Sequence, residues 1–284
     1  MMAAPTQASA SETRPWTFYL LGTLFCAYLV FLYGPMLVIY VLSFQGPDGG
    51  VTFPMVGTSV VWFEKITEPG QMADIPSSFW RSIGLATVVS FLTVLASVAA
   101  GLGFRRHFPG SGVLFYLAVA SLVMPSLLVG FGIGLGFQFL GIKTSLFTSA
   151  LGAQLTWTLP FGLFAMFAVV NRFNRSWEEA ANDLGASAWQ RLVHVTLPIL
   201  LPGILGVAMG ALTLSYDEYA RTTLTIGQQN TLPLEIYALI SSATSPTLFA
   251  IGTVTTAVSF TVIGLTLFLV FRMQRRRGQT PVAD

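Results

Sequence analysis

Charge is scarce in this 284-residue chain: charged residues make up 9% of it and hydrophobic residues 54%. Soluble domains carry about 25% charged residues, so this chain has too few polar groups to cover a surface in water. Its mean hydropathy of +0.71 leads to the same conclusion. The composition excludes a soluble globular protein and predicts a membrane protein.

Cysteine and histidine are scarcer still. The single cysteine, Cys26, excludes an intrachain disulfide and a dithiol redox motif, and we expect it to be a small buried hydrophobe. The two histidines, His107 and His194, lie far apart without cysteine neighbours, so we expect no metal site. The sequence shows no pairing of a nucleophile with a general base, so it does not indicate an enzyme.

Motifs for nucleotide and nucleic acid are missing as well. A phosphate-binding loop of the type GxxxxGK[ST] does not occur, so this chain has no ATPase site of its own. The net charge of +2 is small, and aromatic residues do not alternate with basic ones, so we expect no nucleic-acid partner.

What the chain does have is long apolar runs. A helix needs about 20 apolar residues to cross the hydrocarbon core of a bilayer, and six stretches qualify. We predict an all-α membrane protein with spans at 18–43, 82–104, 112–140, 145–171, 198–218 and 247–271. The flanks are predicted to be a disordered tail over 1–15 and a basic tail over 273–284.

The third predicted span contains Pro125 and the run "GFGIGLG" from Gly130 to Gly136. Proline removes a helical hydrogen bond and glycine weakens a helix interior, so we expect a bend or a break there. No strand precedes the run, which excludes a nucleotide-binding turn; close packing through small residues is the better interpretation.

Lysine and arginine decide the orientation, because loops rich in them stay in the cytoplasm. If the N-terminus is inside, ten of these residues are cytoplasmic and four, Lys65, Arg81, Lys143 and Arg221, are outside. We predict a multi-pass protein of a bacterial inner membrane with both termini in the cytoplasm. The long external loop 45–81 is either a solvated connector or a docking surface for an external partner.

A polar island, "RSWEEAANDLGASAWQRLVHVTLPILLPGI", lies between the fourth and fifth spans and is therefore predicted to be cytoplasmic. Ser176 with Glu179, and Ser187 with Gln190, have the spacing of capping boxes that start two helices. Gly185 between them is predicted to end the first helix in a left-handed conformation.

The first of these helices is amphipathic, with an apolar stripe formed by Trp177, Ala180, Ala181 and Leu184. Its opposite face is acidic and contains Glu178, Glu179, Asn182 and Asp183. An interfacial helix on anionic lipid favours basic residues instead. Docking to a basic groove on a protein partner is therefore favoured over lipid contact or a solvated linker.

At this point the sequence resembles the permease subunits of ATP-binding-cassette (ABC) importers. Their "EAA" motif is matched by Glu179-Ala180-Ala181, Gly185, Val195 and Leu197-Pro198, with valine where the family usually has isoleucine. The resemblance covers about Trp16 to Arg272. The stretch Leu212 to Ile240 is most similar to the spermidine/putrescine-type branch, whereas other relatives carry ferric iron, sulfate or phosphonates.

The resemblance implies a single permease domain over 16–272, with the MetI-like type I importer fold. It also implies a second permease subunit in a heterodimer, two ATPase subunits that use ATP and Mg²⁺, an external substrate-binding protein and membrane lipid. The helix in the 175–198 loop would couple to the ATPase through residues that match or flank the motif: Glu178, Glu179, Ala180, Ala181, Asp183, Gly185, Ala186, Leu197 and Pro198.

Two carboxylates, Asp217 and Glu218, follow the fifth span. Such residues in a membrane usually line a water-filled path, but pairing with Arg221 at the interface is the alternative. The substrate-pathway hypothesis includes Tyr216 and Tyr219, whose rings suit a cation such as a polyamine. A non-transporting scaffold and an ion-driven transporter remain as other classes; the latter would show internal repeats.

Overall fold

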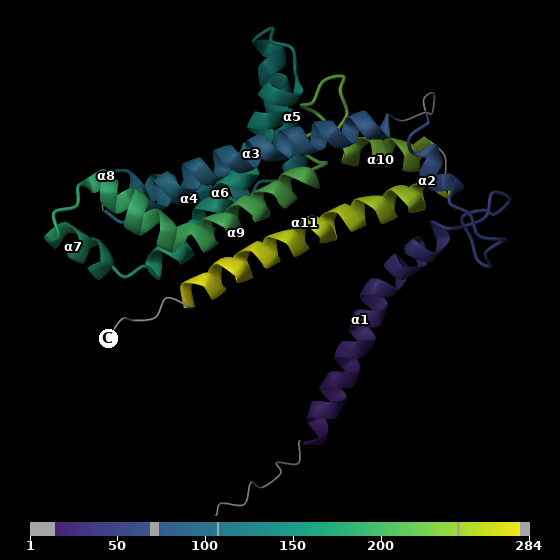
Figure 1. Ribbon diagram of the computed structural model, residues 1–284. Helices are drawn as coiled ribbons and strands as arrows, with labels where there is room; N and C mark the ends of the chain where they lie inside the picture. Colours follow the sequence, from purple (N-terminus) through teal and green to yellow (C-terminus); the bar gives the residue numbers. More distant parts are fainter. Residues whose placement is uncertain (1–14, 69–73, 107, 243–244, 279–284) are drawn as a thin grey trace, which may run out of the picture. The chain divides into compact units, whose positions relative to one another are not determined.

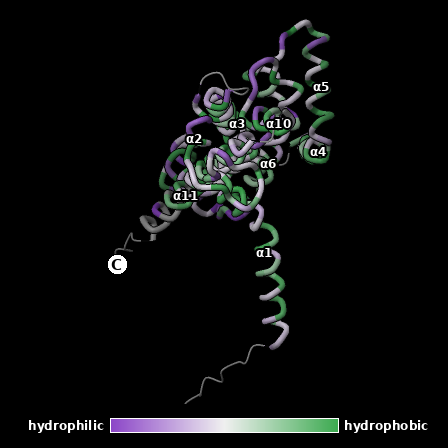
Figure 2. Tube along the Cα trace, turned by 90° about the vertical axis from the view of Figure 1, so that its right-hand side faces the viewer, coloured by the Kyte–Doolittle hydropathy of each residue, from purple (hydrophilic) through white to green (hydrophobic). Residues whose placement is uncertain are grey.

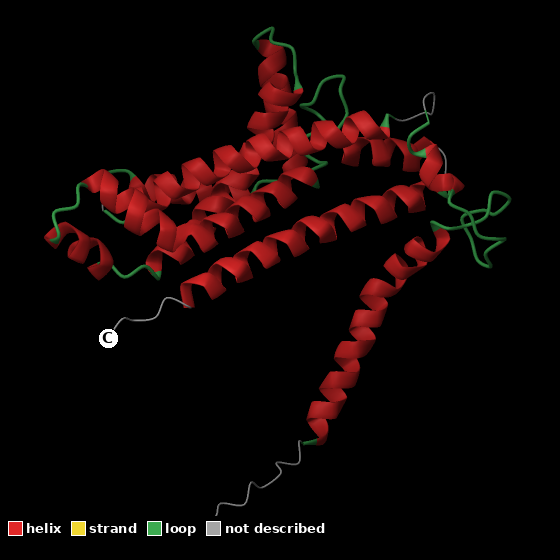
Figure 3. Cartoon of the chain, in the orientation of Figure 1, coloured by secondary structure: helices red, strands yellow, loops and turns green. Residues whose placement is uncertain are grey.

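The computed structural model describes residues 15–68, 74–106, 108–242 and 245–278. These residues form helices and no β-strand, apart from one isolated bridge between Gln45 and Thr58 (Figure 3). His107 lies outside the described residues. So do the predicted tail over 1–15, except for its last residue, and the end of the basic tail. The all-α prediction is confirmed.

The chain divides into two compact units, one formed by residues 1–63 and 245–253 and the other by residues 64–244 and 254–284. The first contains α1 (Trp16–Leu42), which is apolar along its length (Figure 2), and the start of α2 (Val61–Lys65). Cys26 lies on α1 and is exposed, so the expectation that it is buried is wrong. None of the residues in the most apolar window of α1 is buried within the chain.

Gln45 organises the segment that follows α1. Its side-chain amide donates to the carbonyl of Gly50 at 2.9 Å and accepts from the amide of Val56 at 2.9 Å. The indole of Trp62 donates to the carbonyl of Gln45 at 2.7 Å. This part of the external loop predicted over 45–81 is therefore folded around one buried side chain, because buried polar groups need such partners.

The second unit is built on three long helices. They are α3 (Ile75–Gly103), α6 (Leu151–Asn171), which the π-helical segment η1 (Leu146–Ala150) precedes, and α9 (Leu197–Tyr216). The three pack on one another (Figure 1), with Met166, Leu200 and Val207 among the buried residues between them. Helix α11 (Thr247–Gly278) begins in the first unit and continues in the second.

The predicted second span starts too late. Helix α3 begins at Ile75 because the carboxylate of Asp74 accepts a hydrogen bond from the amide of Ser77 at 3.2 Å, and Pro76 occupies its first turn. Residues 75–81, which the sequence placed in the external loop, are therefore helical. Helix α10 (Leu232–Ser242) was not predicted at all.

The third predicted span is broken, as expected. Helix α4 (Ser111–Val123) and helix α5 (Ser126–Phe139) meet at an angle of 106°. Met124 between them is extended, with φ −66° and ψ 133°, as the proline that follows it requires. The described residues contain five helices that are long and apolar enough to span a membrane, or six if this pair counts as one.

The glycine run packs α5 closely, but against a loop and not against a helix. A side chain at Gly130 would lie 2.7 Å from the carbonyl oxygen of Arg221, and one at Gly134 would lie 2.6 Å from that of Leu224. A side chain at Gly132 or Gly136, by contrast, would have no neighbouring atom within 4 Å. Alternate glycines therefore let the main chain after α9 lie directly on α5.

Candidate functional site

The 175–198 loop lies at the C-terminal end of α3 and carries α7 (Ser176–Asp183) and α8 (Ala188–Arg191) (Figure 1). The predicted capping box at Ser176 is wrong, because Ser176 already lies inside α7 and makes no capping contact with its side chain. Instead the carboxamide of Asn174 accepts a hydrogen bond from the amide of Ser176 at 3.0 Å. The carbonyl of Arg175 accepts from Glu178 and Glu179 at 2.9 and 3.1 Å.

The turn after α7 and the start of α8 are as predicted. Gly185 has φ +81°, and the amide of Ala186 donates back to the carbonyl of Ala181 at 3.0 Å. In the capping box of α8, Ser187 donates to the carboxamide of Gln190 at 2.8 Å and accepts from its amide at 3.3 Å. Helix α8 then continues through the π-helical segment η2 (Leu192–Thr196) into α9.

The two faces of α7 do not point as the sequence suggested. Trp177 and Leu184 of the predicted apolar stripe are 60% and 90% exposed, whereas Glu178 of the acidic face is turned inward. Ala181 is half-buried beside it, and Glu179 and Asp183 remain exposed. The surface that α7 presents is therefore apolar and acidic together, and not acidic alone.

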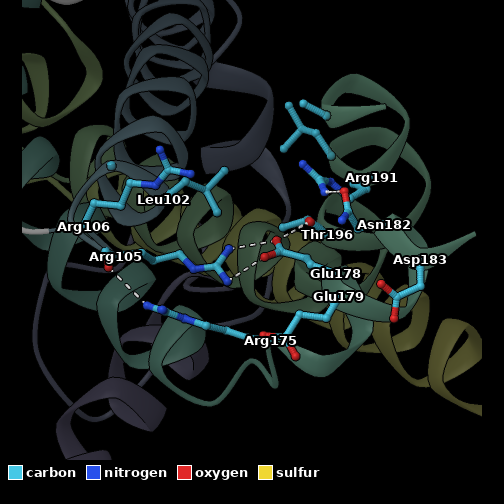
Figure 4. Close-up of a pocket in the computed structure, with 13 residues that line it drawn as sticks. Leu102, Arg105, Arg106, Arg175, Glu178, Glu179, Asn182, Asp183, Arg191 and Thr196 are labelled. Carbon is cyan, nitrogen blue, oxygen red and sulfur yellow. Dashed lines mark hydrogen bonds and ion pairs between the residues drawn. The ribbon is translucent and has the colours of Figure 1, made fainter. Parts of the chain in front are cut away.

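Glu178 is held by the rest of the chain (Figure 4). Both of its oxygens accept hydrogen bonds from the guanidinium of Arg105 at 2.8 Å, and the hydroxyl of Thr196 donates to it at 2.7 Å. The hydrogen bonds from Arg105 hold the pKa of Glu178 below its usual value, against the opposing effect of partial burial. Arg105 also lies 5.2 Å from the ring centroid of Phe173.

A cavity of about 710 Å³ opens between this loop and the end of α3. Its lining is rich in charge of both signs, as Figure 4 shows; the charged members are Arg105, Arg106, Arg175, Glu178, Glu179, Asp183 and Arg191. Ala180 is exposed, Ala186 is half-buried, and Leu197 and Pro198 lie half-buried in the first turn of α9. The structure thus brings all the motif residues to one end of the bundle.

The second group of predicted residues lies at the other end of α3. Tyr216 is buried and its ring is 6.4 Å from that of Phe79 in the second turn of α3. The ring of Tyr219 lies 4.8 Å from that of Tyr237 in α10, tilted by 41°. Asp217 is exposed and takes part in no ion pair among the described residues.

Glu218 is neutralised within its own turn. It accepts a hydrogen bond from the backbone amide of Arg221 at 2.9 Å and lies 3.4 Å from its guanidinium. Pairing of the carboxylates with Arg221 was the alternative to a substrate-lining role, and it is confirmed for Glu218. Of the two carboxylates, only that of Asp217 is both exposed and outside an ion pair among the described residues.

Arg221 is the buried residue that the sequence did not single out as such. Only 1% of its side chain is exposed. Its guanidinium donates to the hydroxyl of Ser126 at 2.8 Å, at the start of α5, and lies 5.0 Å from the ring of Trp157 in α6. Nε and Nη2 have no partner among the described residues. The i+3 spacing from Glu218 was a signal for the ion pair, but nothing local indicates the contacts with α5 and α6.

Beside this turn runs a chain of buried polar contacts. The amide of Gln154 in α6 donates to Thr222 at 2.9 Å and accepts from the hydroxyl of Ser215. The backbone carbonyl of Gln154 accepts from the hydroxyl of Thr158, which accepts in turn from Thr93 of α3 at 2.9 Å. The turn after α9 is therefore tied to two helices through a chain of buried side-chain hydrogen bonds.

These features, a bundle of helices long and apolar enough to span a membrane with a two-helix loop at one end, are typical of a membrane permease. The family model described as "Binding-protein-dependent transport system inner membrane component" matches residues 92–277, well over half of the chain. The chain belongs to this family of ABC-importer permeases.

Known relatives and structures are consistent with this assignment. The spermidine/putrescine transport permease PotC of Escherichia coli K12 is 26% identical over 85% of this chain and 90% of its own. The putrescine transport permease PotI of the same organism is 27% identical, over 89% and 90%. The crystal structure of a bacterial ABC transporter involved in alginate import superposes with a TM-score of 0.63 at 15% identity, covering 93% of this chain and 99% of that one. The last comparison shows the fold alone.

Proposed function

We propose that the chain forms half of the translocation pathway of an ATP-driven importer and works with a second permease subunit in a heterodimer. The observation that carries the proposal is the 175–198 loop, in which a left-handed turn at Gly185 separates two helices at one end of the bundle. Membership of the permease family supports it. Two ATPase subunits, an external binding protein and the surrounding lipid complete the working assembly.

Helix α7 is the element we assign to the ATPase contact. Trp177 and Leu184 are exposed large apolar residues on a short helix whose neighbours Glu179 and Asp183 are acidic. Such a mixed surface fits an apolar cleft with a basic rim. ATP and Mg²⁺ are bound by the ATPase subunits, and closure of their dimer would displace α7.

Reversal of charge and loss of the turn test this assignment. Glu179→Arg and Gly185→Val should leave the protein inserted in the membrane but abolish uptake, since a β-branched residue resists a positive φ. Gly185→Asn is the matched control, because asparagine adopts the left-handed conformation far more readily. Normal uptake by both Glu179→Arg and Gly185→Val would show that α7 is not the coupling element.

The substrate we propose is a polyamine or a related small amine. Sequence similarity to permeases named for spermidine and putrescine supports it, as do the exposed carboxylate of Asp217 and the neighbouring rings of Tyr219 and Tyr237. Tyr216, Asp217, Glu218 and Tyr219 would border the pathway, with Glu218 acting through Arg221. High-affinity selection is left to the binding protein. Ferric iron, phosphonate or sulfate is the alternative cargo.

The direct experiment is uptake of labelled spermidine by the reconstituted complex, with putrescine, ferric iron, sulfate and phosphonate as competitors. Asp217→Asn should lower turnover while leaving the affinity of the binding protein for the amine unchanged. If sulfate or iron, but not putrescine, competes with uptake, the substrate belongs to the alternative class and the polyamine assignment is wrong. A scaffold without transport activity would give no substrate-stimulated ATP hydrolysis with any of them.

Orientation is tested by labelling. In a Cys26→Ala background, a single cysteine in place of Thr58 should react from outside the cell and one in place of Ala188 from the cytoplasmic side; both positions are exposed. Both termini are then in the cytoplasm of the bacterial cell, as the distribution of arginine predicts. Labelling of both cysteines from outside intact cells would contradict this topology.

A further inference from the structure

The contact between Arg105 and Glu178 joins three elements that are distant in the sequence. Arg105 follows the C-terminal end of α3, Glu178 is in α7, and Thr196, which also binds Glu178, precedes α9. All three side chains are brought to one point by hydrogen bonds of 2.7 to 2.8 Å. Figure 4 shows the guanidinium and the carboxylate facing each other at the centre of the cavity wall.

The geometry differs from that of an ordinary surface ion pair. Both nitrogens of the fork are used, the side chains of Arg105 and Glu178 are only 16% and 26% exposed, and Phe173 packs against the guanidinium. The carbonyl of Arg105 accepts a further hydrogen bond from Arg175 at 3.1 Å. A bidentate pair of this kind fixes direction as well as distance.

The neighbouring arginine provides a contrast. Arg106 is exposed, and its side chain makes no hydrogen bond or ion pair within the described part of the chain. Two consecutive arginines of the same charge and length therefore have different surroundings, and only Arg105 is tied to α7.

Without such a tie, α7 would be a poor lever. Its chain connections are the segment 172–175 on one side and the Gly185 turn on the other. Both connections are irregular, so a push on α7 is partly absorbed where the backbone bends. Asn182 of α7 also accepts a hydrogen bond from Arg191 of α8 across the Gly185 turn, but this contact does not reach α3. The Arg105–Glu178–Thr196 contact bypasses both connections and links α7 directly to the ends of α3 and α9.

The two helices that receive the link are themselves packed as a pair. Ser90 of α3 donates to the carbonyl of Ala208 in α9 at 2.7 Å, and Val94 packs against the core that contains Val207. A displacement delivered at Arg105 and Thr196 would therefore move α3 and α9 together.

We propose that Arg105 is a positioning residue that, through Glu178, makes α7 move as one body with α3 and α9. The proposal rests on the function proposed above and deepens it: Glu178 serves this chain's own rigidity, while Trp177, Glu179 and Leu184 face the ATPase. Loss of the tie uncouples the subunits without separating them.

The test uses the complete complex in proteoliposomes, with labelled spermidine as the probe and an affinity tag on this chain. Arg105→Gln and Glu178→Gln should retain the copurified ATPase at the wild-type amount. Spermidine taken up per ATP hydrolysed should fall roughly tenfold, the factor to which about 1.4 kcal/mol corresponds. Arg105→Lys should be intermediate, since lysine offers a point charge and not a fork.

Two further variants separate this role from a general loss of folding. Arg105→Glu combined with Glu178→Arg restores a pair of opposite charges and should recover part of the uptake per ATP. Arg106→Gln removes the same charge one residue away and should match the wild type.

The proposal is overturned if either single variant couples normally, if Arg106→Gln falls as far as Arg105→Gln, or if the swapped pair recovers nothing. Loss of the copurified ATPase from Glu178→Gln would place Glu178 in the subunit contact and overturn it too. Failure of the wild-type chain to retain an ATPase or to take up spermidine would instead contradict the proposed function.

Discussion

Two arginine–glutamate pairs occur among the described residues, one near each end of α3, and they differ in sequence separation, geometry and burial. Arg105 and Glu178 lie 73 residues apart, and their side chains are partly exposed and joined by two hydrogen bonds of 2.8 Å. Arg221 and Glu218 lie three residues apart, at 3.4 Å, and are 1% and 11% exposed. The first pair connects elements; the second neutralises a charge that the fold has buried.

The difference shows that burial and usefulness as a connection are separate properties. A buried pair brings little net stability, because removing both ions from water costs about as much as their attraction returns, but breaking it is expensive. A partly exposed bidentate pair costs less to form and less to lose. The following variants test this contrast.

The largest effect is expected at the buried pair. Glu218→Ala leaves the guanidinium of Arg221 without its counter-charge and should lower the free energy of unfolding by about 3–5 kcal/mol. The measurement is denaturation in mild detergent. Asp217→Ala, which removes an exposed carboxylate next to it, should change stability by less than about 0.5 kcal/mol. Equal losses in the two variants would mean that Glu218 does not compensate Arg221.

The surroundings of the buried pair should be nearly as sensitive. A methyl group at Gly130 would lie 2.7 Å from the carbonyl oxygen of Arg221, so Gly130→Ala should cost about 1–3 kcal/mol by overpacking. Gly132→Ala meets no neighbouring atom within 4 Å and is the matched control. If the alanine at 130 is as stable as the one at 132, the close approach of the loop is not real.

A smaller effect is expected at the connecting pair. A double-mutant cycle with Arg105→Gln and Glu178→Gln should give a coupling of about 1 kcal/mol in the free energy of unfolding, because both side chains retain some contact with solvent. The same cycle with Arg106→Gln in place of Arg105→Gln should give a value near zero. Coupling at Arg106 equal to that at Arg105 would remove the distinction between the two arginines.

The smallest effect is its pH dependence. Since the pKa of Glu178 is lower in the folded chain than in the unfolded one, the pair contributes its full stability above the ordinary glutamate pKa of about 4.3 and loses it as the pH falls through the folded value. The difference in thermal midpoint between the wild type and Glu178→Gln should therefore be constant near neutral pH and shrink in acid. A difference that grows in acid would have the wrong sign for a lowered pKa.

Much of the loop could be predicted because its signals are local. Gly185 and the Ser187–Gln190 box act over a few residues, and the structure has both. The predicted box at Ser176 is wrong because a competing acceptor, Asn174, lies two residues earlier. The inward orientation of Glu178 was missed for a different reason. An amphipathic pattern says which residues share a face, but which face is turned inward depended on Arg105, which lies just beyond the end of α3.

At the other end of the bundle, too, local contacts could be predicted and long-range contacts could not. The i+3 spacing predicted the pairing of Glu218 with Arg221, whereas Ser126 and Trp157, which also contact Arg221, come from helices about 95 and 64 residues earlier. The broken span was predictable from Pro125, because proline constrains its own neighbours. Its angle was not, because that depends on the loop that lies on α5.

Apart from the hydrogen bond of the Arg221 side chain to Ser126, that loop contacts α5 through main-chain atoms: the backbone of Arg221 faces Gly130, and the carbonyl of Leu224 faces Gly134. Such an interface specifies where the loop lies without specifying which side chains it carries. Positions of the turn after α9 whose side chains take no part in the Glu218–Arg221–Ser126 contacts can therefore change during evolution while the position of the turn against α5 is kept, provided that the two glycines remain. Because Gly130 and Gly134 hold this position without side chains of their own, the side chains beside the proposed pathway can change while the architecture around it is retained.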